Sequence, residues 1–351
     1  MTEIGHRVVI DELAEEPLHA IARARLVEMA CPDPKDLSPR DVIVAVRAAA
    51  VGWVDLLMTS GQYQHHAKPP YTPGLEYAGV VAWAGPEAPH VTPGQRVLVD
   101  PFLAGPRSLG AYQAYGGFAS YAVAPVEAIH PIPDGLDFAQ ACNLLGNFET
   151  AYHCLITRGR LAAGETVLIH GASGATGLAA VQLAKLVGAT VIATGRSAHK
   201  LAVVAAQGAD HVIAGPFRDR VKELTGGRGV DLVYDGVGGD ISVESLRCVR
   251  FAARYLIVGW AATPFVAKSS PNQLPTNLIM MKGLDVLGCP TAITSAHDPA
   301  SRPPRLARIL AWAHAGELHP HVSHRFPLRE FAAAMRAKWN SEPVGGCVVE
   351  P

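Results

Sequence analysis

An apolar run that ends in a turn of small residues is the part of this sequence best suited to chemistry. Residues 166–171 read Thr-Val-Leu-Ile-His-Gly, and Ala172, Gly174 and Gly177 follow at the spacing of the pattern G-x-G-x-x-G. Such residues make a tight turn, admit a pyrophosphate and let the next helix lie close to the strand. Because an apolar helical segment follows, the helix begins where phosphates would bind. The expected contacts are Ala172, Ser173, Gly174, Ala175, Thr176 and Gly177.

The end of the next predicted strand, residues 190–194, indicates which dinucleotide would bind. An NAD site places an Asp or Glu there to bind the ribose 2′-hydroxyl. This chain has Thr194-Gly-Arg-Ser-Ala-His-Lys200 instead, and its hydroxyls and cations suit a 2′-phosphate. The sequence therefore predicts NADPH; the alternative is that the cations are ordinary solvated residues at a helix start. The expected contacts are Gly195, Arg196, Ser197 and Lys200.

The elements around this turn alternate between strand and helix patterns, which predicts a doubly wound parallel sheet. The expected strands are 166–171, 190–194, 211–213, 231–235, 254–258 and 284–288, and the expected helices are 175–187, 198–206, 217–225 and 240–248. Residues 1–130 are rich in β-branched residues, Gly and Pro, which indicates a compact β domain. The C-terminal elements expected at 302–316, 322–325, 328–338 and 346–350 are too few for a domain and should rejoin the first one.

Composition limits the class of protein. A chain of 351 residues that is 49% hydrophobic and 17% charged is expected to form two domains with buried cores. A net charge of −1 with no basic run argues against a nucleic-acid partner. No leader pattern and no membrane-length apolar stretch is visible, which predicts a cytoplasmic protein without a membrane partner. The six cysteines are scattered without a C-x-x-C pattern, as expected of reduced thiols.

Several motifs in chain order carry a family resemblance. They are Pro73-Gly-Leu-Glu-Tyr-Ala-Gly79, Gly94-Gln-Arg-Val97, Gly116-Gly-Phe-Ala-Ser-Tyr121, Asn147-Phe-Glu-Thr-Ala-Tyr152 and the A-x-G-x-x-G turn. The chain resembles the medium-chain dehydrogenase/reductase superfamily, and within it the zinc-independent quinone oxidoreductases. The resemblance implies an α/β protein in which a GroES-like catalytic domain, residues 1–129 and 290–351, flanks a Rossmann NADPH-binding domain, residues 130–289. It also implies an active site in the cleft between the domains and a homodimer, paired through the strand at 284–288.

The resemblance also raises the question of a catalytic zinc. The zinc alcohol dehydrogenases of the superfamily draw three ligands from places that fall here on Gly52, Leu75 and about Gly146. None of these side chains can bind a metal. Their loop of four cysteines is absent as well, while the pair His65-His66 and the trio His319, His321 and His324 lack a suitable arrangement. We therefore expect no metal.

A metal-free site implies hydride delivery from NADPH to a quinone or an α,β-unsaturated carbonyl, with hydrogen bonds to the oxyanion that forms. By resemblance the candidate proton donor is Tyr63, and its alternative is packing at a loop. Trp53 adds bulk and one N–H donor beside Gly52, and Asp55 is as well explained by a structural role. The remaining cofactor contacts by analogy are Thr150, Gly236, Val258, Gly259 and Trp260.

Two alternatives to a quinone or enone reductase stay open. An enoyl-thioester reductase would share the framework but needs a tunnel for a pantetheine arm, which the sequence does not identify. A non-catalytic NADPH-binding protein would keep the same turn residues. The exact substrate does not follow from the sequence.

Overall fold

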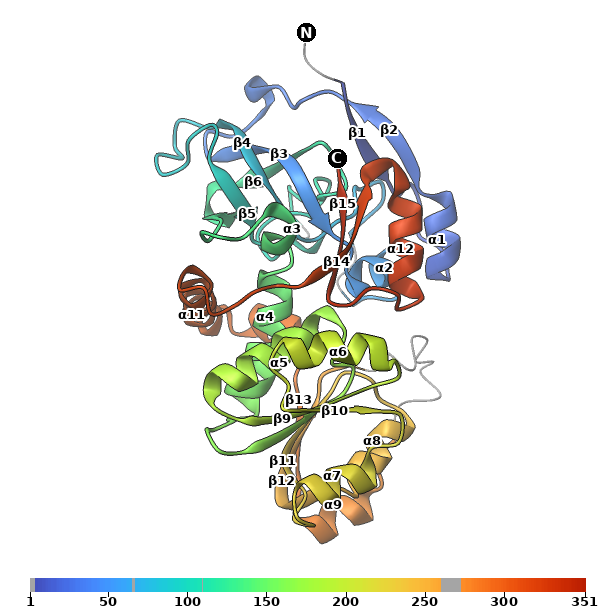
Figure 1. Ribbon diagram of the computed structural model, residues 1–351. Helices are drawn as coiled ribbons and strands as arrows, with labels where there is room; N and C mark the ends of the chain where they lie inside the picture. The colour runs from blue at the N-terminus through green and yellow to red at the C-terminus, as the bar shows by residue number, and fades with distance from the viewer. Residues whose placement is uncertain (1–3, 65–66, 109, 260–272) are drawn as a thin grey trace. The chain divides into compact units, whose positions relative to one another are not determined.

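The computed structural model describes residues 4–64, 67–108, 110–259 and 273–351. The chain divides into two compact units, of which unit 1 is Met1–Gly146 with His319–Pro351 and unit 2 is Asn147–Leu318 (Figure 1). The sequence placed these changes after residues 129 and 289. Helix α3 (Phe138–Ala141) packs on three strands of unit 1, which keeps this segment with that unit.

Unit 2 contains a six-stranded sheet in which all neighbouring strands are parallel. Its strands are β8 (Thr166–Ile169), β9 (Thr190–Gly195), β10 (His211–Ala214), β11 (Val230–Asp235), β12 (Val249–Ile257) and β13 (Asp285–Gly288). Their spatial order, β10-β9-β8-β11-β12-β13, is that of a dinucleotide-binding Rossmann sheet. The predicted doubly wound sheet is therefore confirmed.

Four helices of unit 2 correspond to predicted ones: α5 (Ala175–Val187), α6 (Ala198–Ala206), α7 (Arg218–Leu224) and α8 (Asp240–Ser245). The first two have the predicted bounds because clear signals mark them. Gly188, with φ +89°, ends α5 in the left-handed conformation, and the Ser197 side chain caps the start of α6. Leu168, Val233 and Tyr255 from the sheet are buried in the core.

Of the remaining elements of unit 2, the sequence predicted only the helix at 302–316, which is α11 (Arg302–His314). Unit 2 also contains α4 (Leu145–Tyr152), a π-helical segment (His153–Arg158), α9 (Thr276–Lys282) and α10 (Thr291–His297). A buried ion cluster joins two of these elements: Glu149 on α4, fully buried, accepts from Arg302 at 2.8 Å and from Arg305 at 3.1 Å on α11. Buried charges need such partners, so this cluster fixes α11 against α4.

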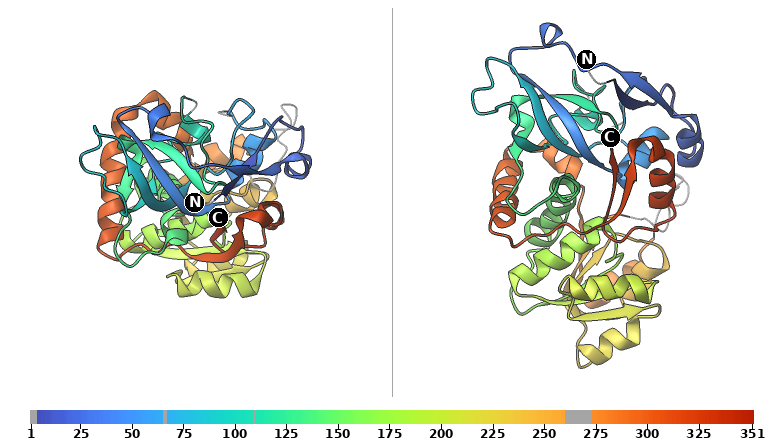
Figure 2. Two further views of the ribbon diagram at one scale, coloured as in Figure 1. Left: turned by 90° about the horizontal axis from the view of Figure 1, so that it is seen from above. Right: turned by 45° about the horizontal axis from the view of Figure 1, so that its top comes forward.

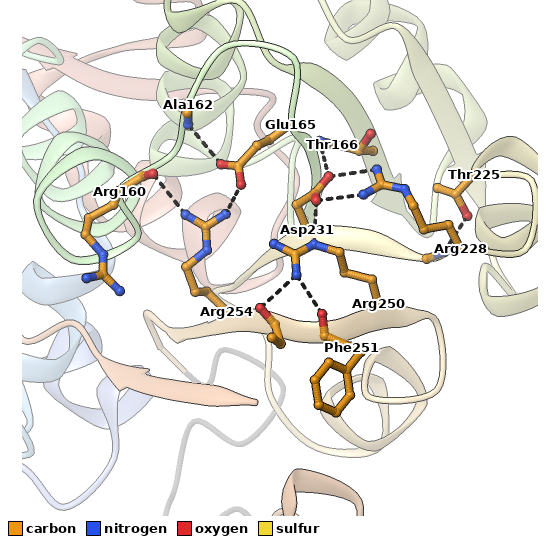
Figure 3. Close-up of polar contacts among 12 residues, drawn as sticks. Arg160, Ala162, Glu165, Thr166, Thr225, Arg228, Asp231, Arg250, Phe251 and Arg254 are labelled. Atoms are coloured by element: carbon orange, nitrogen blue, oxygen red, sulfur yellow. Dashed lines mark hydrogen bonds and ion pairs between the residues drawn. The ribbon is translucent and has the colours of Figure 1, made fainter. Parts of the chain in front are cut away.

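A network of arginines and acids surrounds the amino ends of strands β8, β11 and β12 (Figure 3). Asp231 accepts from Arg228 at 2.9 Å, from Arg250 at 2.6 Å and from the backbone N–H of Thr166 at 2.8 Å. Burial alone would raise the pKa of Asp231, but these hydrogen bonds lower it to about 2. Arg254 pairs with Glu165 in the same network. Because its charges satisfy one another, the network is structural and leaves the carboxyl ends of the strands for ligands.

Unit 1 is built on a seven-stranded sheet. Its strands are β3 (Asp41–Ala50), β4 (Tyr77–Ala84), β5 (Arg96–Val99), β6 (Tyr121–Pro125), β7 (Ile129–Pro131), β14 (Val322–Pro327) and β15 (Gly346–Glu350). The last strand, β15, pairs antiparallel with β3, so that Val348 lies opposite Ala50. The elements expected at 322–325, 328–338 and 346–350 thus rejoin the first part of the chain, whereas α11, the helix expected at 302–316, belongs to unit 2.

The remaining elements of unit 1 surround this sheet. They are β1 (Gly5–Val9), β2 (Arg25–Met29), α1 (Pro17–Arg23), α2 (Trp53–Thr59), α12 (Phe331–Trp339), and short 3-10 turns at Pro34–Asp36, Pro106–Ser108, Val126–Ala128 and Leu328–Glu330; a further one, Pro299–Ser301, belongs to unit 2. Helix α12 packs beside α1 and α2 (Figures 1 and 2). Among the described residues, no helix has the length and apolar character needed to cross a membrane.

Candidate cofactor site and candidate active site

The turn after β8 has the geometry that close helix packing requires. Gly171 adopts φ +64°, and the N–H of Gly174 donates to its carbonyl at 3.0 Å. A Cβ added at Gly177 would lie 2.3 Å from the Gly171 oxygen and 2.8 Å from Cα of Ala172, so only glycine fits there. A Cβ added at Gly174 would meet no atom closer than 3.4 Å. The second small residue therefore faces space that a ligand can enter.

The amino end of α5 follows this turn directly. Gly174 is its N-cap, no side chain caps it, and its first turn carries no acidic residue. The first N–H groups of a helix lack partners within the helix and attract anions. Ser173, Ala175 and Thr176 are half-buried here, and the hydroxyl of Thr176 donates to Asn147 Oδ1 at 3.1 Å. This bond ties the turn to α4, which carries the half-buried Thr150.

A buried histidine lies beneath the turn, at the end of β8. His170 Nε2 is 2.6 Å from the hydroxyl of Ser245, which itself donates to the carbonyl of Ile241 at 2.7 Å. Nε2 must therefore carry the proton, and Nδ1 accepts from the hydroxyl of Thr194 at 2.6 Å. Burial lowers the pKa of His170 to about 4, so the ring is neutral. His170 thus connects the turn after β8 to the end of β9.

The residues predicted to bind the 2′-phosphate stand at the start of α6. Arg196 is exposed, while Gly195, Ser197 and Lys200 are half-buried. The Ser197 hydroxyl accepts from the N–H of Lys200 at 3.5 Å. The Ala172 N–H donates to the carbonyl of Thr194 at 3.4 Å, which places the end of β9 beside the phosphate turn.

The turns after β11 and β12 lie together at the same edge of the sheet. Asp235 accepts from the N–H of Val237 at 2.8 Å, and its carbonyl accepts from Val258 at 2.9 Å and Gly259 at 3.2 Å. A Cβ added at Gly171 would lie 3.1 Å from Val237, so the turn after β8 is adjacent. The structure thus gathers Gly236, Val258 and Gly259 at the point where the strand order reverses, the usual ligand position of such sheets. Trp260 lies outside the described residues.

In unit 1, Asp55 joins the loops that hold two of the three zinc-ligand places. Its carboxylate accepts from the N–H groups of Gly52 at 2.8 Å, Gly74 at 3.0 Å and Leu75 at 3.1 Å. Burial raises the pKa of Asp55 to about 6, against the lowering effect of these bonds. Asp55 is 3% exposed, which leaves it no room to contact a substrate. The structure therefore supports its structural interpretation.

The third zinc-ligand place is joined to the same region by Glu76, which accepts from the N–H of Gly146. The three places are thus neighbours, yet two of them are glycines without a side chain and the third is Leu75, whose side chain is apolar. No group of three or more His, Cys, Asp or Glu side chains suited to a metal occurs within the residues that the structure describes. His65 and His66 fall outside those residues. The ammonium of Lys338 lies near Asp55 and Glu76, and burial lowers its pKa.

The two predicted catalytic residues of unit 1 occupy different settings. Trp53, the first residue of α2, stacks on Trp339 of α12 with ring centroids 5.4 Å apart and planes at 4°. Tyr63 is half-buried and packs on the apolar cluster that includes Tyr71 and Leu75. Trp339 was not among the predicted site residues, because a single tryptophan on a helix does not reveal its partner.

A Rossmann sheet with a phosphate turn and a GroES-like β unit in one chain define a medium-chain dehydrogenase/reductase. The family models agree: residues 38–134 match "Alcohol dehydrogenase GroES-like domain" and residues 175–298 match "Zinc-binding dehydrogenase". The chain is 32% identical over 320 residues to a quinone oxidoreductase-like protein 2 homolog of Nematostella vectensis, covering 90% of this chain and 83% of that one. The chain belongs to the quinone oxidoreductase-like family of this superfamily.

Two further comparisons bear on cofactor and substrate. The solved structure of a mycobacterial protein in complex with NADPH is 26% identical, with a TM-score of 0.80, over 99% of this chain and 100% of that one. Highly-reducing polyketide synthase 1 of Aureobasidium melanogenum is 35% identical over 235 residues, which are 65% of this chain and 10% of that protein. The family is one of oxidoreductases that use a nicotinamide cofactor.

Proposed function

We propose that this protein is an NADPH-dependent, zinc-independent reductase that delivers hydride to a quinone or an α,β-unsaturated carbonyl. The observation that carries the cofactor assignment is the end of β9, where Arg196, Ser197 and Lys200 stand without an acidic neighbour. A carboxylate there would repel a 2′-phosphate, whereas guanidinium and ammonium groups bind it. The solved NADPH complex of a similar protein supports the same assignment.

The residues of the turn fit a dinucleotide. Gly174 leaves space beside the amino end of α5, and Gly177 lets that helix approach β8. The proposed pyrophosphate contacts are the backbone of residues 172–177, and the proposed nicotinamide contacts are Thr150, Gly236, Val258 and Gly259. NADPH supplies the hydride when it is bound. The protein's part is to orient the ring and to stabilise charge on the substrate oxygen.

Zinc independence is proposed from the ligand places themselves. Gly52, Leu75 and Gly146 are brought together by Asp55 and Glu76 but offer no ligand atom. Without a Lewis acid, a plain ketone is a poor hydride acceptor, while a conjugated carbonyl spreads the negative charge. We assign Tyr63 as the hydrogen-bond donor to the substrate oxygen and Trp53, stacked on Trp339, as an apolar wall.

The proposal is tested by NADPH consumption with 1,4-benzoquinone, with 4-phenylbut-3-en-2-one and with crotonyl-CoA. Turnover of the quinone or the enone that persists after treatment with a strong chelator is the expected result. Tyr63→Phe should lower kcat for the enone about tenfold or more while leaving the dissociation constant of NADPH unchanged. Binding of NADPH without turnover of any of the three compounds would refute the enzyme assignment.

The second candidate function is an enoyl-thioester reductase. The similarity to a polyketide synthase favours it. Turnover restricted to crotonyl-CoA in the same assay would select this function over the first.

We further propose a cytoplasmic homodimer. Strand β13 is the last strand of its sheet, so a second copy can pair with its outer edge. Sedimentation of the purified protein measures the oligomeric state directly.

A further inference from the structure

Arg107 is a cation of unit 1 to which the proposed reaction assigns no role. Its guanidinium lies over the ring of Phe102, 4.9 Å from the centroid. The Nε atom is buried and has no hydrogen-bond acceptor, and no carboxylate within the described part of the chain forms an ion pair with this residue. A guanidinium has five N–H donors, and a half-buried one normally pairs with an anion.

The loop that carries Arg107 packs against the segment that contains Leu75, one of the three zinc-ligand places. A Cβ added at Gly105 would lie 3.7 Å from the carbonyl oxygen of Leu75 and 3.8 Å from that of Gly74. Asp55 accepts hydrogen bonds from the N–H groups of both residues, and the positive charge of Arg107 nearby acts to lower the pKa of Asp55. Arg107 therefore stands beside the part of unit 1 to which the proposed function assigns the substrate.

Asp55 cannot serve as the missing partner of Arg107. Its two oxygens already accept from three backbone N–H groups, and no bond to the guanidinium is formed. The hydroxyls of Tyr71 and Thr72, on the segment that leads to Gly74, are also buried without a partner. Buried donors without acceptors are rare in folded proteins and mark places where a ligand or water completes the site.

An anionic oxygen group is the ligand that this arrangement fits. Arginine binds carboxylate and phosphate groups through two parallel N–H bonds, whereas a neutral quinone offers single carbonyl oxygens. We propose that Arg107 binds a carboxylate or phosphate group of the substrate, so that the substrate of this reductase is an enone or quinone with an anionic substituent. This inference rests on the proposed function for the chemistry and on Arg107 for the specificity.

The test compares 4-phenylbut-3-en-2-one with its para-carboxylate and its para-phosphonate. Dissociation constants come from quenching of tryptophan fluorescence, and kcat and KM from NADPH consumption. Arg107→Met should weaken binding of the charged compound by about tenfold to a hundredfold and that of the neutral enone by less than about twofold. The loss should appear in KM rather than in kcat, and Arg107→Lys should restore part of it because it keeps the charge.

Arg329→Met is the matched control, because Arg329 is an exposed arginine of unit 1. Thermal unfolding of Arg107→Met shows whether the variant folds, and Arg107→Lys tests the same contact if it does not. Equal losses for neutral and charged compounds, or no preference of the wild type for either charged compound, would overturn the inference. Arg107-dependent binding of the carboxylate or phosphonate without turnover would sustain Arg107 as an anion-binding residue and refute the proposed reaction. The better of the two charged compounds identifies the anionic group.

Discussion

Replacing Asp55 by asparagine should change how the stability of the protein depends on pH. Burial raises the pKa of Asp55 from its ordinary value of 3.8 to about 6. At about 1.36 kcal/mol per unit, this corresponds to about 3 kcal/mol. Below pH about 4 the carboxyl is protonated in both the folded and the unfolded state, so its burial carries no charge penalty. As the pH rises to about 6, the unfolded chain ionises first and the folded state loses about 3 kcal/mol.

Asparagine cannot ionise, so it removes this loss but presents an NH₂ group to backbone N–H donors. At pH about 4 the variant should be less stable than the wild type by about 1–3 kcal/mol. Between pH about 4 and pH about 7 the difference should shift in favour of the variant by about 3 kcal/mol.

The assay is urea unfolding at several pH values, followed by the near-ultraviolet circular dichroism of the stacked Trp53 and Trp339 in unit 1. Asp36→Asn, at an exposed aspartate of the same unit, corrects for general effects of charge. Wild-type and variant curves that run parallel would refute the reasoning. A shift in the opposite direction would show that the three N–H bonds of Asp55 outweigh its burial.

Three further predictions concern unit 2. Replacing both Arg196 and Lys200 by alanine should weaken the binding of NADPH by about tenfold to a hundredfold and leave the binding of NADH nearly unchanged, because only NADPH carries the 2′-phosphate. Calorimetric titration measures both affinities. Gly174→Ala should fold normally yet bind NADPH about tenfold or more weakly, whereas Gly177→Ala should lose about 1–3 kcal/mol or more of unfolding free energy, since its methyl group meets backbone. Glu149→Gln should cost about 3–5 kcal/mol in urea unfolding, because it leaves two buried guanidinium groups without their anion.

Controls and contrary outcomes follow from the same contacts. Arg220→Ala replaces an exposed arginine of α7 that is paired with Glu223, and it should leave the affinities for NADPH and NADH unchanged. Equal losses for NADPH and NADH in the double variant would remove the 2′-phosphate assignment. A stable Gly177→Ala protein would show that α5 can move away from β8, and an unchanged Glu149→Gln protein would mean that solvent reaches the cluster.

Local signals made the Rossmann unit predictable. Its strands are apolar runs, and α5 and α6 have capping residues, Gly188 and Ser197, that mark their ends in the sequence. The turn after β8 was predictable because the spacing of its small residues reflects local demands: Gly177 has no room for a Cβ, and Gly174 leaves space for a ligand. Strand β12 begins earlier than predicted, at Val249, because its pairing with β11 is interrupted after Val230 and the sequence pattern breaks there.

Contacts between residues far apart in the chain were not predictable. Two contacts join segments that are far apart in the sequence: the stack of Trp53 on Trp339 and the ion pair of Glu149 with Arg302. In neither pair does a sequence pattern around one residue predict its contact with the other. Arg107 is a similar case, because its significance is the absence of a partner among the described residues, which only the folded structure reveals.

Cofactor preference after metal removal tests the central claim most directly. The protein is treated with a strong chelator, and kcat/KM is then measured for NADPH and for NADH with the quinone or enone held at saturation. We expect retained turnover, no response to added Zn²⁺, and a preference for NADPH of about tenfold or more. Activity that is lost with the chelator and restored by Zn²⁺, or equal use of the two cofactors, would contradict it.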